Sequence, residues 1–269
     1  MIFDKKILLL FFICLVFSVI SYSQGEFETA REPDNYNMNS FGIKLNSNGF
    51  GGYYNFSKRI NYRLRRFIEV EYNFVKDPKE TKVVNSQFQS STSRNFVYGK
   101  LISAHNLKFG YGYNRMIFEK RDKNSISIHL LGSVGASLII GKPIYYEYFN
   151  LRDSIITYGK FDLDDLSNND FIIGKGPVKM GFSEMKFYPG LYAKFGVAFD
   201  FSRDVMKSNV LEAGVVLDGF FRPVEIMAGN ERNMILSLYV MYSFGQKYDA
   251  LINREFRKEQ RKNARKNKE

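Results

Sequence analysis

One pair of residues in this sequence has the types and spacing of a hydrolytic site. Ser103 and His105 lie two positions apart, so on a strand both side chains would project from one face. A serine becomes a nucleophile when a histidine takes its proton, and an acid must orient that histidine. The predicted neighbouring strands offer no suitable acid on this face. We therefore favour the alternative interpretation, in which both residues lie at a polar rim without a catalytic role.

The other candidate side chains are a histidine and an acidic loop. His129 falls on the polar face of a predicted strand, where we expect a hydrogen-bonded interior residue. Asp162, Asp164, Asp165 and Asp170 cluster in a long loop, but their spacing lacks the Gly and the closing Glu of a calcium loop. The sequence has no zinc-ligand spacing, Gly-rich phosphate loop or nucleophile elbow. We therefore expect no metal and no cofactor.

The N-terminus has the pattern of a secretory signal peptide. A short basic region at Lys5 and Lys6 precedes an apolar run over residues 7–20, and small serines then suit cleavage before Gln24. We predict a signal peptide over residues 1–23. The alternative is an uncleaved anchor, for which this run is short because a helical span needs about 20 apolar residues.

Export and signal-peptide cleavage would exclude several kinds of site and partner for the mature chain. The only cysteine, Cys14, lies in the apolar run, so the cleaved chain would have neither a disulfide nor a thiolate metal site. The formal net charge of +11 is compatible with nucleic acid or anionic lipid, and export argues against nucleic acid as a partner. The tail over residues 246–269, with nine Lys or Arg and four Asp or Glu, would contact anionic headgroups or a periplasmic protein. The alternative is a solvated, disordered tail.

Strand-like alternation is the main pattern of the rest of the chain. The sequence has 26 Phe, 18 Tyr and 21 Gly but only 6 Pro, a composition that suits many β-strands. We predict an all-β fold: an eight-stranded antiparallel transmembrane β-barrel over residues 40–245, with a flexible lead-in over 24–39 and a helical or disordered tail after 245. The expected strands are 41–46, 50–57, 64–74, 96–118, 126–141, 187–201, 211–221 and 236–245.

The connections alternate in length, with one exception. The second, fourth and sixth are short, whereas the third and fifth are long and the seventh, over 222–233, is intermediate; only the first breaks the pattern. Bacterial outer-membrane barrels have even strand numbers, short periplasmic turns and longer outer loops. We therefore expect an outer-membrane location with both termini in the periplasm. Within the longest loop, 142–184, residues 144–150 and 155–161 would form a hairpin.

The last predicted strand closes the barrel. Its residues Leu238, Val240, Tyr242 and Phe244 share one face, and it must pair with 41–46 to remove both sheet edges. Together with the signal peptide, the C-terminal third resembles the small outer-membrane β-barrel proteins of the Bacteroidetes type, porin-like proteins without an assigned activity. The resemblance is carried by this strand and by residues 188–196, 212–214, 220–221 and 224–228.

The polar faces of the strands indicate which side is the interior. They combine many Gly, Ser and Ala with long charged side chains, as the narrow interior of an eight-stranded barrel requires. We predict apolar faces outward and a plugged, charge-paired lumen; the alternative is a soluble, lipocalin-like barrel with apolar faces inward. The predicted lumen residues are Lys44, Arg65, Lys100, Lys108, Lys194, Glu69, Glu71, Asp200, Glu212 and Asp218.

These features predict the cellular location of the protein more specifically than its biochemical activity. We expect a non-enzymatic envelope component or an accessory subunit of an outer-membrane assembly, in contact with outer-membrane lipid and with envelope proteins through the basic tail or the outer loops. One alternative is a lipid-modifying hydrolase, since lipid A deacylases use a Ser, a His and an acid on the lipid-facing surface. The order of Ser103 and His105 differs from the deacylase motif. The other alternative is a narrow channel or ligand-binding barrel.

Overall fold

The computed structural model describes residues 36–83, 95–120, 125–150, 155–161, 170–202 and 207–249. These residues fall in one compact unit, Asp34–Glu269. The predicted signal peptide, the lead-in up to residue 35 and the tail beyond 249 lie outside the described residues. No helix in the described part of the chain is long and apolar enough to cross a membrane.

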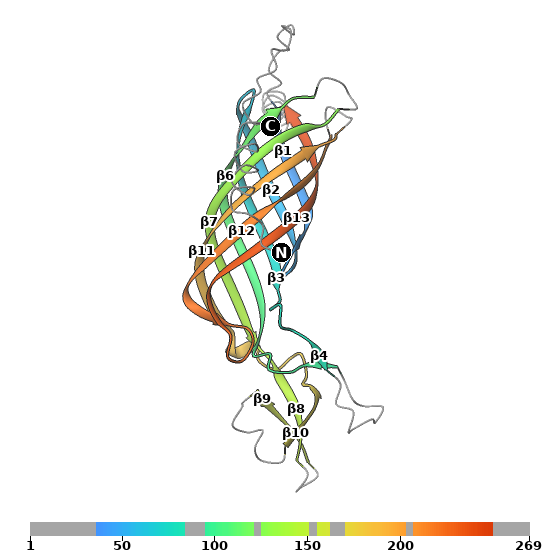
Figure 1. Cartoon of the computed structure of the whole chain (residues 1–269), viewed down its shortest axis with the longest axis vertical. Coiled ribbons are helices and arrows are strands. Elements are labelled where there is room, and N and C mark those ends of the chain that lie inside the picture. Colours follow the sequence, from blue (N-terminus) through green and yellow to red (C-terminus); the bar gives the residue numbers. More distant parts are fainter. Residues whose placement is uncertain are drawn as a thin grey trace, which may run out of the picture. The chain divides into compact units, whose positions relative to one another are not determined.

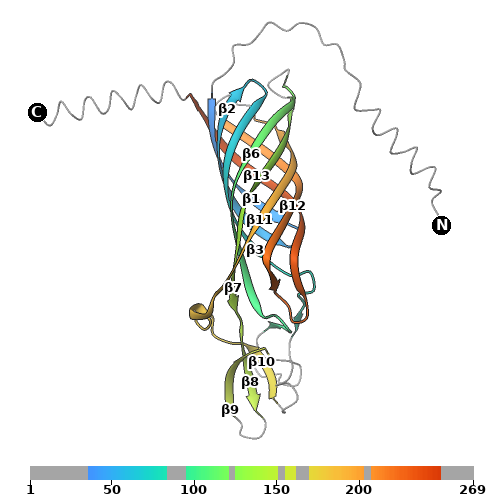
Figure 2. The ribbon, with the colours of Figure 1, turned by 90° about the vertical axis from the view of Figure 1, so that its left-hand side faces the viewer.

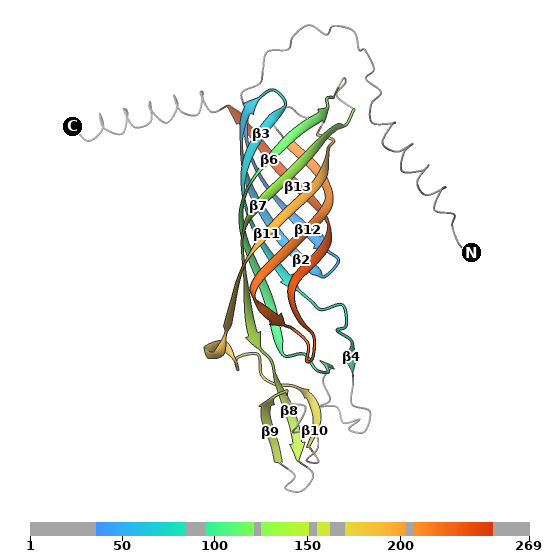
Figure 3. The same cartoon turned by 60° about the vertical axis from the view of Figure 1, so that its left-hand side comes forward.

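Eight antiparallel strands close into a barrel, which confirms the predicted fold class (Figure 1). Around the ring the order is β1-β13-β12-β11-β7-β6-β3-β2, so each barrel strand pairs with the previous and the next barrel strand along the chain. The strands are tilted about the barrel axis, as closure requires (Figure 3). The barrel strands are β1 (Tyr36–Asn46), β2 (Gly49–Asn61), β3 (Leu64–Val75), β6 (Ile102–Phe118), β7 (Ser127–Pro143), β11 (Lys186–Asp200), β12 (Lys207–Glu225) and β13 (Glu231–Asp249).

The first and last strands close the ring, as predicted. Phe41 lies opposite Phe244 and Leu45 opposite Val240. The ladder continues to Tyr36 opposite Asp249, so the predicted barrel limits of 40 and 245 were too narrow at both termini. Backbone pairing needs no apolar side chain, and this polar part of the two strands therefore extends the sheet beyond the alternating pattern.

The connections lie at two distinct ends of the barrel. At the end that holds both termini of the barrel, which we call the terminal end, the connections over residues 62–63, 119–126 and 201–206 are short. At the opposite, loop end lie the tight turn 47–48 and the long connections 76–101 and 144–185. The prediction of an intermediate loop over residues 222–233 is wrong. The strands β12 and β13 continue past a bulge and leave only residues 226–230 between them.

A small sheet extends beyond the loop end of the barrel (Figure 2). The predicted hairpin is confirmed as β8 (Tyr145–Asn150) paired with β9 (Ile155–Lys160), and an unpredicted strand β10 (Asp170–Lys175) pairs with the other edge of β8. The other minor elements are the pair β4 (Lys82–Val83) and β5 (Phe96–Val97) and the 3-10 helix η4 (Phe182–Glu184).

Tyr146 anchors this sheet to the connection between β3 and β6. Its ring is buried beside Phe96 and Phe161, and its hydroxyl lies 2.7 Å from the carbonyl oxygens of Val97 and Lys100. Burial raises the pKa of the Tyr146 hydroxyl above its ordinary value. The phenol therefore stays neutral and continues to donate a hydrogen bond at physiological pH.

Small residues make room for large ones inside the barrel. Gly110 on β6 faces the hydroxyl of Tyr192 on β11, which a Cβ at position 110 would overlap. Gly132 on β7 has no heavy atom within 4 Å of its Cβ position. The interior is thus packed at Gly110, whereas Gly132 faces open space on the outer side of the wall.

We expect Gly110→Val to lower the free energy of unfolding by about 1–3 kcal/mol, because overpacking forces the Tyr192 side chain aside. Gly132→Val is the matched control and should leave stability unchanged or slightly raised, since the new side chain meets open space. Urea unfolding of the chain refolded into lipid vesicles measures both. Equal destabilisation by the two variants would contradict a closely packed interior.

Candidate functional site

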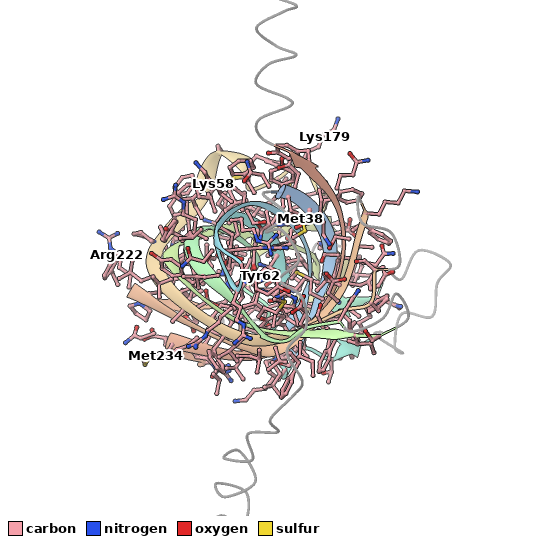
Figure 4. All side chains as sticks on the ribbon, turned by 90° about the horizontal axis from the view of Figure 1, so that it is seen from above. Met38, Lys58, Tyr62, Lys179, Arg222 and Met234 are labelled. Atoms are coloured by element: carbon pink, nitrogen blue, oxygen red, sulfur yellow. The ribbon has the colours of Figure 1, made fainter. Side chains whose placement is uncertain are left out.

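The outer surface of the barrel is apolar. All four predicted closing-strand residues, Leu238, Val240, Tyr242 and Phe244, are exposed, with Leu238 at 62%. Viewed along the barrel, Met234 and Arg222 project outward whereas Met38 lies inside the ring (Figure 4). Apolar side chains thus face outward, the reverse of a soluble ligand-binding barrel. So large a contiguous apolar surface marks contact with a membrane or a partner.

The lumen contains a buried network of ion pairs. The Lys44 ammonium lies 2.7 Å from a Glu71 oxygen, and Lys194 lies 2.9 Å from the other oxygen of the same carboxylate. Glu69 also accepts hydrogen bonds from Lys194, from the Tyr192 hydroxyl at 2.8 Å and from a serine. Lys44, Glu69 and Glu71 have no solvent exposure. Each charge in this group is therefore compensated inside the barrel rather than by water.

Two further contacts extend the network along β12. Lys108 lies 2.7 Å from Asp218, and the Tyr239 hydroxyl donates to Glu212 at 2.6 Å. Lys194 is also 3.9 Å from Glu212. The structure thus brings together seven of the ten predicted lumen residues, contributed by five different strands. Such a network couples strands that are not neighbours in the wall.

The predicted lumen residues Asp200 and Arg65 lie towards the terminal end of the barrel. Asp200 is buried at the end of β11 and contacts Lys120 at 3.2 Å and Lys247 at 4.0 Å. Arg65 is half-buried on β3, opposite Asn114 of β6. These two residues are separate from the central group and form part of the inner rim.

Lys100 is not part of the lumen network, which corrects its predicted position. The backbone of Gly99 has a φ of 74°, a left-handed conformation that interrupts the strand, so β6 begins only at Ile102. Lys100 instead pairs with Glu80 of the connection between β3 and β6, at 2.7 Å. Burial lowers the pKa of Lys100, although its contact with Glu80 acts in the opposite direction.

Sequence reasoning did not assign a role to the interior phenols. Tyr53, Tyr192 and Tyr239 are buried among the ion pairs, and Lys194 lies 5.2 Å from the Tyr53 ring. Tyr192 and Tyr239 lie on the same strand faces as the predicted inward residues. Alternation therefore indicates their position, but their carboxylate partners are distant in sequence.

The two Ser-His pairs lie in different environments. On the outer face, Ser103 Oγ is 3.4 Å from His105 Nε2, and His105 Nδ1 is 2.6 Å from the Tyr72 hydroxyl. Tyr72 also stacks on the His105 ring, with centroids 5.9 Å apart. Inside the barrel, the His129 ring lies 3.1 Å from the Ser127 hydroxyl and 2.9 Å from the Asn114 side-chain oxygen. His129 is therefore a hydrogen-bonded interior residue, as predicted.

The outer pair has the geometry of a nucleophile and base without a carboxylate. With Nδ1 protonated and donating to the Tyr72 oxygen, Nε2 of His105 can accept the Ser103 proton. A neutral phenol orients the ring but does not stabilise an imidazolium as a carboxylate does. The arrangement supports at most weak activation of Ser103.

The described residues contain no group of three or more His, Cys, Asp or Glu side chains placed to hold a metal ion. Of the predicted acidic cluster, Asp162, Asp164 and Asp165 lie outside the described residues. Asp170 begins β10.

No family model and no curated protein matches the sequence. Among solved structures, neisserial surface protein A (NspA) is 11% identical, over 79% of this chain and 96% of its own, with a TM-score of 0.39. A second similar structure is that of Ail, the attachment invasion locus protein of Yersinia pestis, in complex with the heparin analogue sucrose octasulfate. Ail is 9% identical over 80% of this chain and 99% of its own, with a TM-score of 0.40. A second Ail structure gives a TM-score of 0.38. At these values the fold assignment rests on the strand pairing of the chain itself.

Removing the Glu71 carboxylate should destabilise the barrel strongly. Glu71→Ala leaves Lys44 and Lys194 short of a counter-charge, and breaking a buried ion pair costs about 3–5 kcal/mol. Urea unfolding in lipid vesicles measures the loss. Glu184→Gln, which removes the exposed ion pair with Lys160, is the control and should unfold like wild type. A Glu71→Ala barrel as stable as the control would refute the network's role.

Proposed function

We propose that this chain is an integral outer-membrane β-barrel with a plugged lumen, which acts as a non-enzymatic envelope component or as an accessory subunit of an outer-membrane assembly. The observation that carries the proposal is the combination of an apolar exterior with fully buried ion pairs inside. In water this arrangement would expose apolar side chains that hydrocarbon accepts without cost.

The dimensions of the barrel support a membrane location. Its strands contain 11 to 19 residues, and a tilted strand needs only about 9–11 to cross the hydrocarbon core. Closure pairs both edges of the sheet, which a segment in hydrocarbon requires because no water is present to satisfy its backbone. We propose that the terminal end, with its short turns, faces the periplasm.

The contacts across the interior support a plugged lumen. Lys44, Glu71, Lys194 and Glu69 form a continuous series of hydrogen bonds from β1 through β3 to β11. Passage of an ion through this region would require breaking contacts between fully buried charges. Such contacts are costly to separate because no water replaces them.

The small sheet at the loop end supports a role in assembly. On β9, Ile155 and Ile156 are 57% and 52% exposed, and Tyr158 is 45% exposed. β9 is an edge strand of its sheet, and exposed edges are used to pair with strands of other proteins. We propose envelope proteins as partners at these loops or at the basic tail, and no nucleic acid.

The plugged lumen is tested by conductance. We expect the purified chain, reconstituted into a planar bilayer, to show no steady ion current because the buried ion pairs close the interior. Folding is checked by a heat-modifiable gel shift of the same sample. Regular conductance steps from folded wild type would contradict the plug and favour a channel, whereas solubility of the mature chain without detergent would contradict the membrane location.

A second candidate function is a lipid-modifying hydrolase, favoured by the contact between Ser103 and His105 on the outer face. We expect Ser103→Ala to abolish any acyl release from lipid A that the folded chain shows, since it removes the nucleophile. Ser127→Ala, in the interior Ser-His pair, is the matched control and should retain that release. Mass spectrometry of the lipid measures both, and wild type that releases no acyl chain would eliminate this candidate.

A further inference from the structure

A groove lies on the outer surface at the loop end of the barrel. It has a volume of about 500 Å³. It is lined by Ser103, His105 and Ile140 of the barrel wall and by residues of the segment 176–185, which connects β10 to β11. This connection, which we call the strap, lies beside the end of β7 in Figures 2 and 3.

The strap is held in place by specific contacts. The Lys142 ammonium donates to the carbonyl of Val178 and lies 3.8 Å from the centre of the Phe182 ring. Gly181 has a φ of 86°, a conformation that lets the strap pass close to the backbone of β7. Glu184 accepts hydrogen bonds from Lys160 and, at 3.1 Å, from Tyr145. These bonds hold the pKa of Glu184 below its ordinary range.

Apolar side chains of the strap are exposed. Val178 is 67%, Phe182 is 57% and Met180 is 37% exposed. They continue the apolar exterior of the barrel beyond the ends of the strands, and all three line the groove together with Ile140 of β7. Residues of this kind at the edge of a transmembrane band lie among lipid headgroups and the first methylene groups of the acyl chains.

The groove is also cationic. Lys142 and Lys175 both line it, and their like charges repel each other. No acidic side chain of the described residues lines the groove. A phosphate bound between the two ammonium groups would relieve this repulsion, while its acyl chains would contact the apolar wall.

We propose that the groove binds the phosphorylated, acylated sugar headgroup of an outer-leaflet glycolipid of the lipid A class. Lys142 and Lys175 would hold the phosphate, the hydroxyls of Ser103 and Tyr72 would face the sugar, and the acyl chains would run along Ile140 and the apolar side chains of the strap. The assignment of the leaflet rests on the proposed outer-membrane location with the loop end outward. A choline headgroup would bind less well, because it places a positive charge against the two lysines.

The test uses the full chain in a neutral detergent, with bound lipid measured by native mass spectrometry. We expect adducts with monophosphoryl lipid A, and at least tenfold weaker binding of dephosphorylated lipid A and of phosphatidylcholine. Phosphatidylglycerol bound as tightly as lipid A would overturn the glycolipid assignment. Displacement by millimolar inorganic phosphate would overturn binding of a lipid in favour of a free phosphate site.

Double variants inside and outside the groove test whether the groove is the lipid-binding site. Lys142→Gln with Lys175→Gln should weaken lipid A binding at least tenfold, and Val178→Ser with Phe182→Ser should weaken it several-fold. The matched control is Lys58→Gln with Arg66→Gln, an exposed cross-strand pair at the terminal end, which should bind like wild type. Undiminished binding by the lysine double variant, or equal loss in the control, would refute the groove.

Folding and chemistry are followed in the same samples. Lys175→Gln alone, outside the barrel strands, repeats the test if the double variant does not fold. Wild type that shows no heat-modifiable shift would refute the membrane proposal, whereas folded wild type without a lipid A adduct would refute the groove alone. Bound lipid of unchanged mass supports binding without hydrolysis, and acyl loss that depends on Ser103 supports binding together with hydrolysis.

Discussion

The ion pairs of Glu71 inside the barrel are the interaction on which the rest of the structure depends. One carboxylate accepts hydrogen bonds from Lys44 of β1 and Lys194 of β11, strands that are not neighbours in the wall. Buried charges are tolerated only when paired, and they stay paired only while the barrel is closed and in register. A slip of β3 by one residue would turn Glu69 and Glu71 outward. Closure of the barrel, the register of its strands and the pairing of charges in the lumen therefore depend on one another.

The same strand register places apolar side chains on the outer surface of the barrel. Because side chains alternate along each strand, the arrangement that turns Lys44 inward also exposes Ile43 and Leu45 at 66% and 61%. A barrel of eight strands is narrow, so its interior accepts long side chains only where small residues face them, as Gly110 faces Tyr192. At the loop end this alternation stops, and Lys142 together with the strap forms a concave surface that is both apolar and cationic.

The two Ser-His pairs have the same spacing but lie on opposite sides of the barrel wall. Ser103 and His105 have the same spacing as Ser127 and His129, and in both pairs the hydroxyl contacts the imidazole Nε2. The first pair faces outward on β6 and the second faces inward on β7. Spacing alone places two side chains on one face of a strand. The other residues of each face decide whether it meets the surroundings or the lumen, since His105 shares its face with the exposed Phe109 and His129 shares its face with the buried Ser133.

The alternating pattern by itself determined the number of barrel strands and the polarity of each face, because period-2 alternation is a local property. The pairing of 41–46 with the last strand followed from the need to remove both sheet edges, and the hairpin followed from two short segments that flank residues 151–154. Only the tertiary structure decided what depends on distant residues. Glu71 and Lys194 are 123 positions apart, so their pairing cannot be deduced from either strand. The left-handed Gly99 shifted Lys100 out of the lumen, and β10 and the strap are held by contacts with β7, β8 and β9. Sequence thus determined which side chains face inward, and closure of the barrel decided which of them meet.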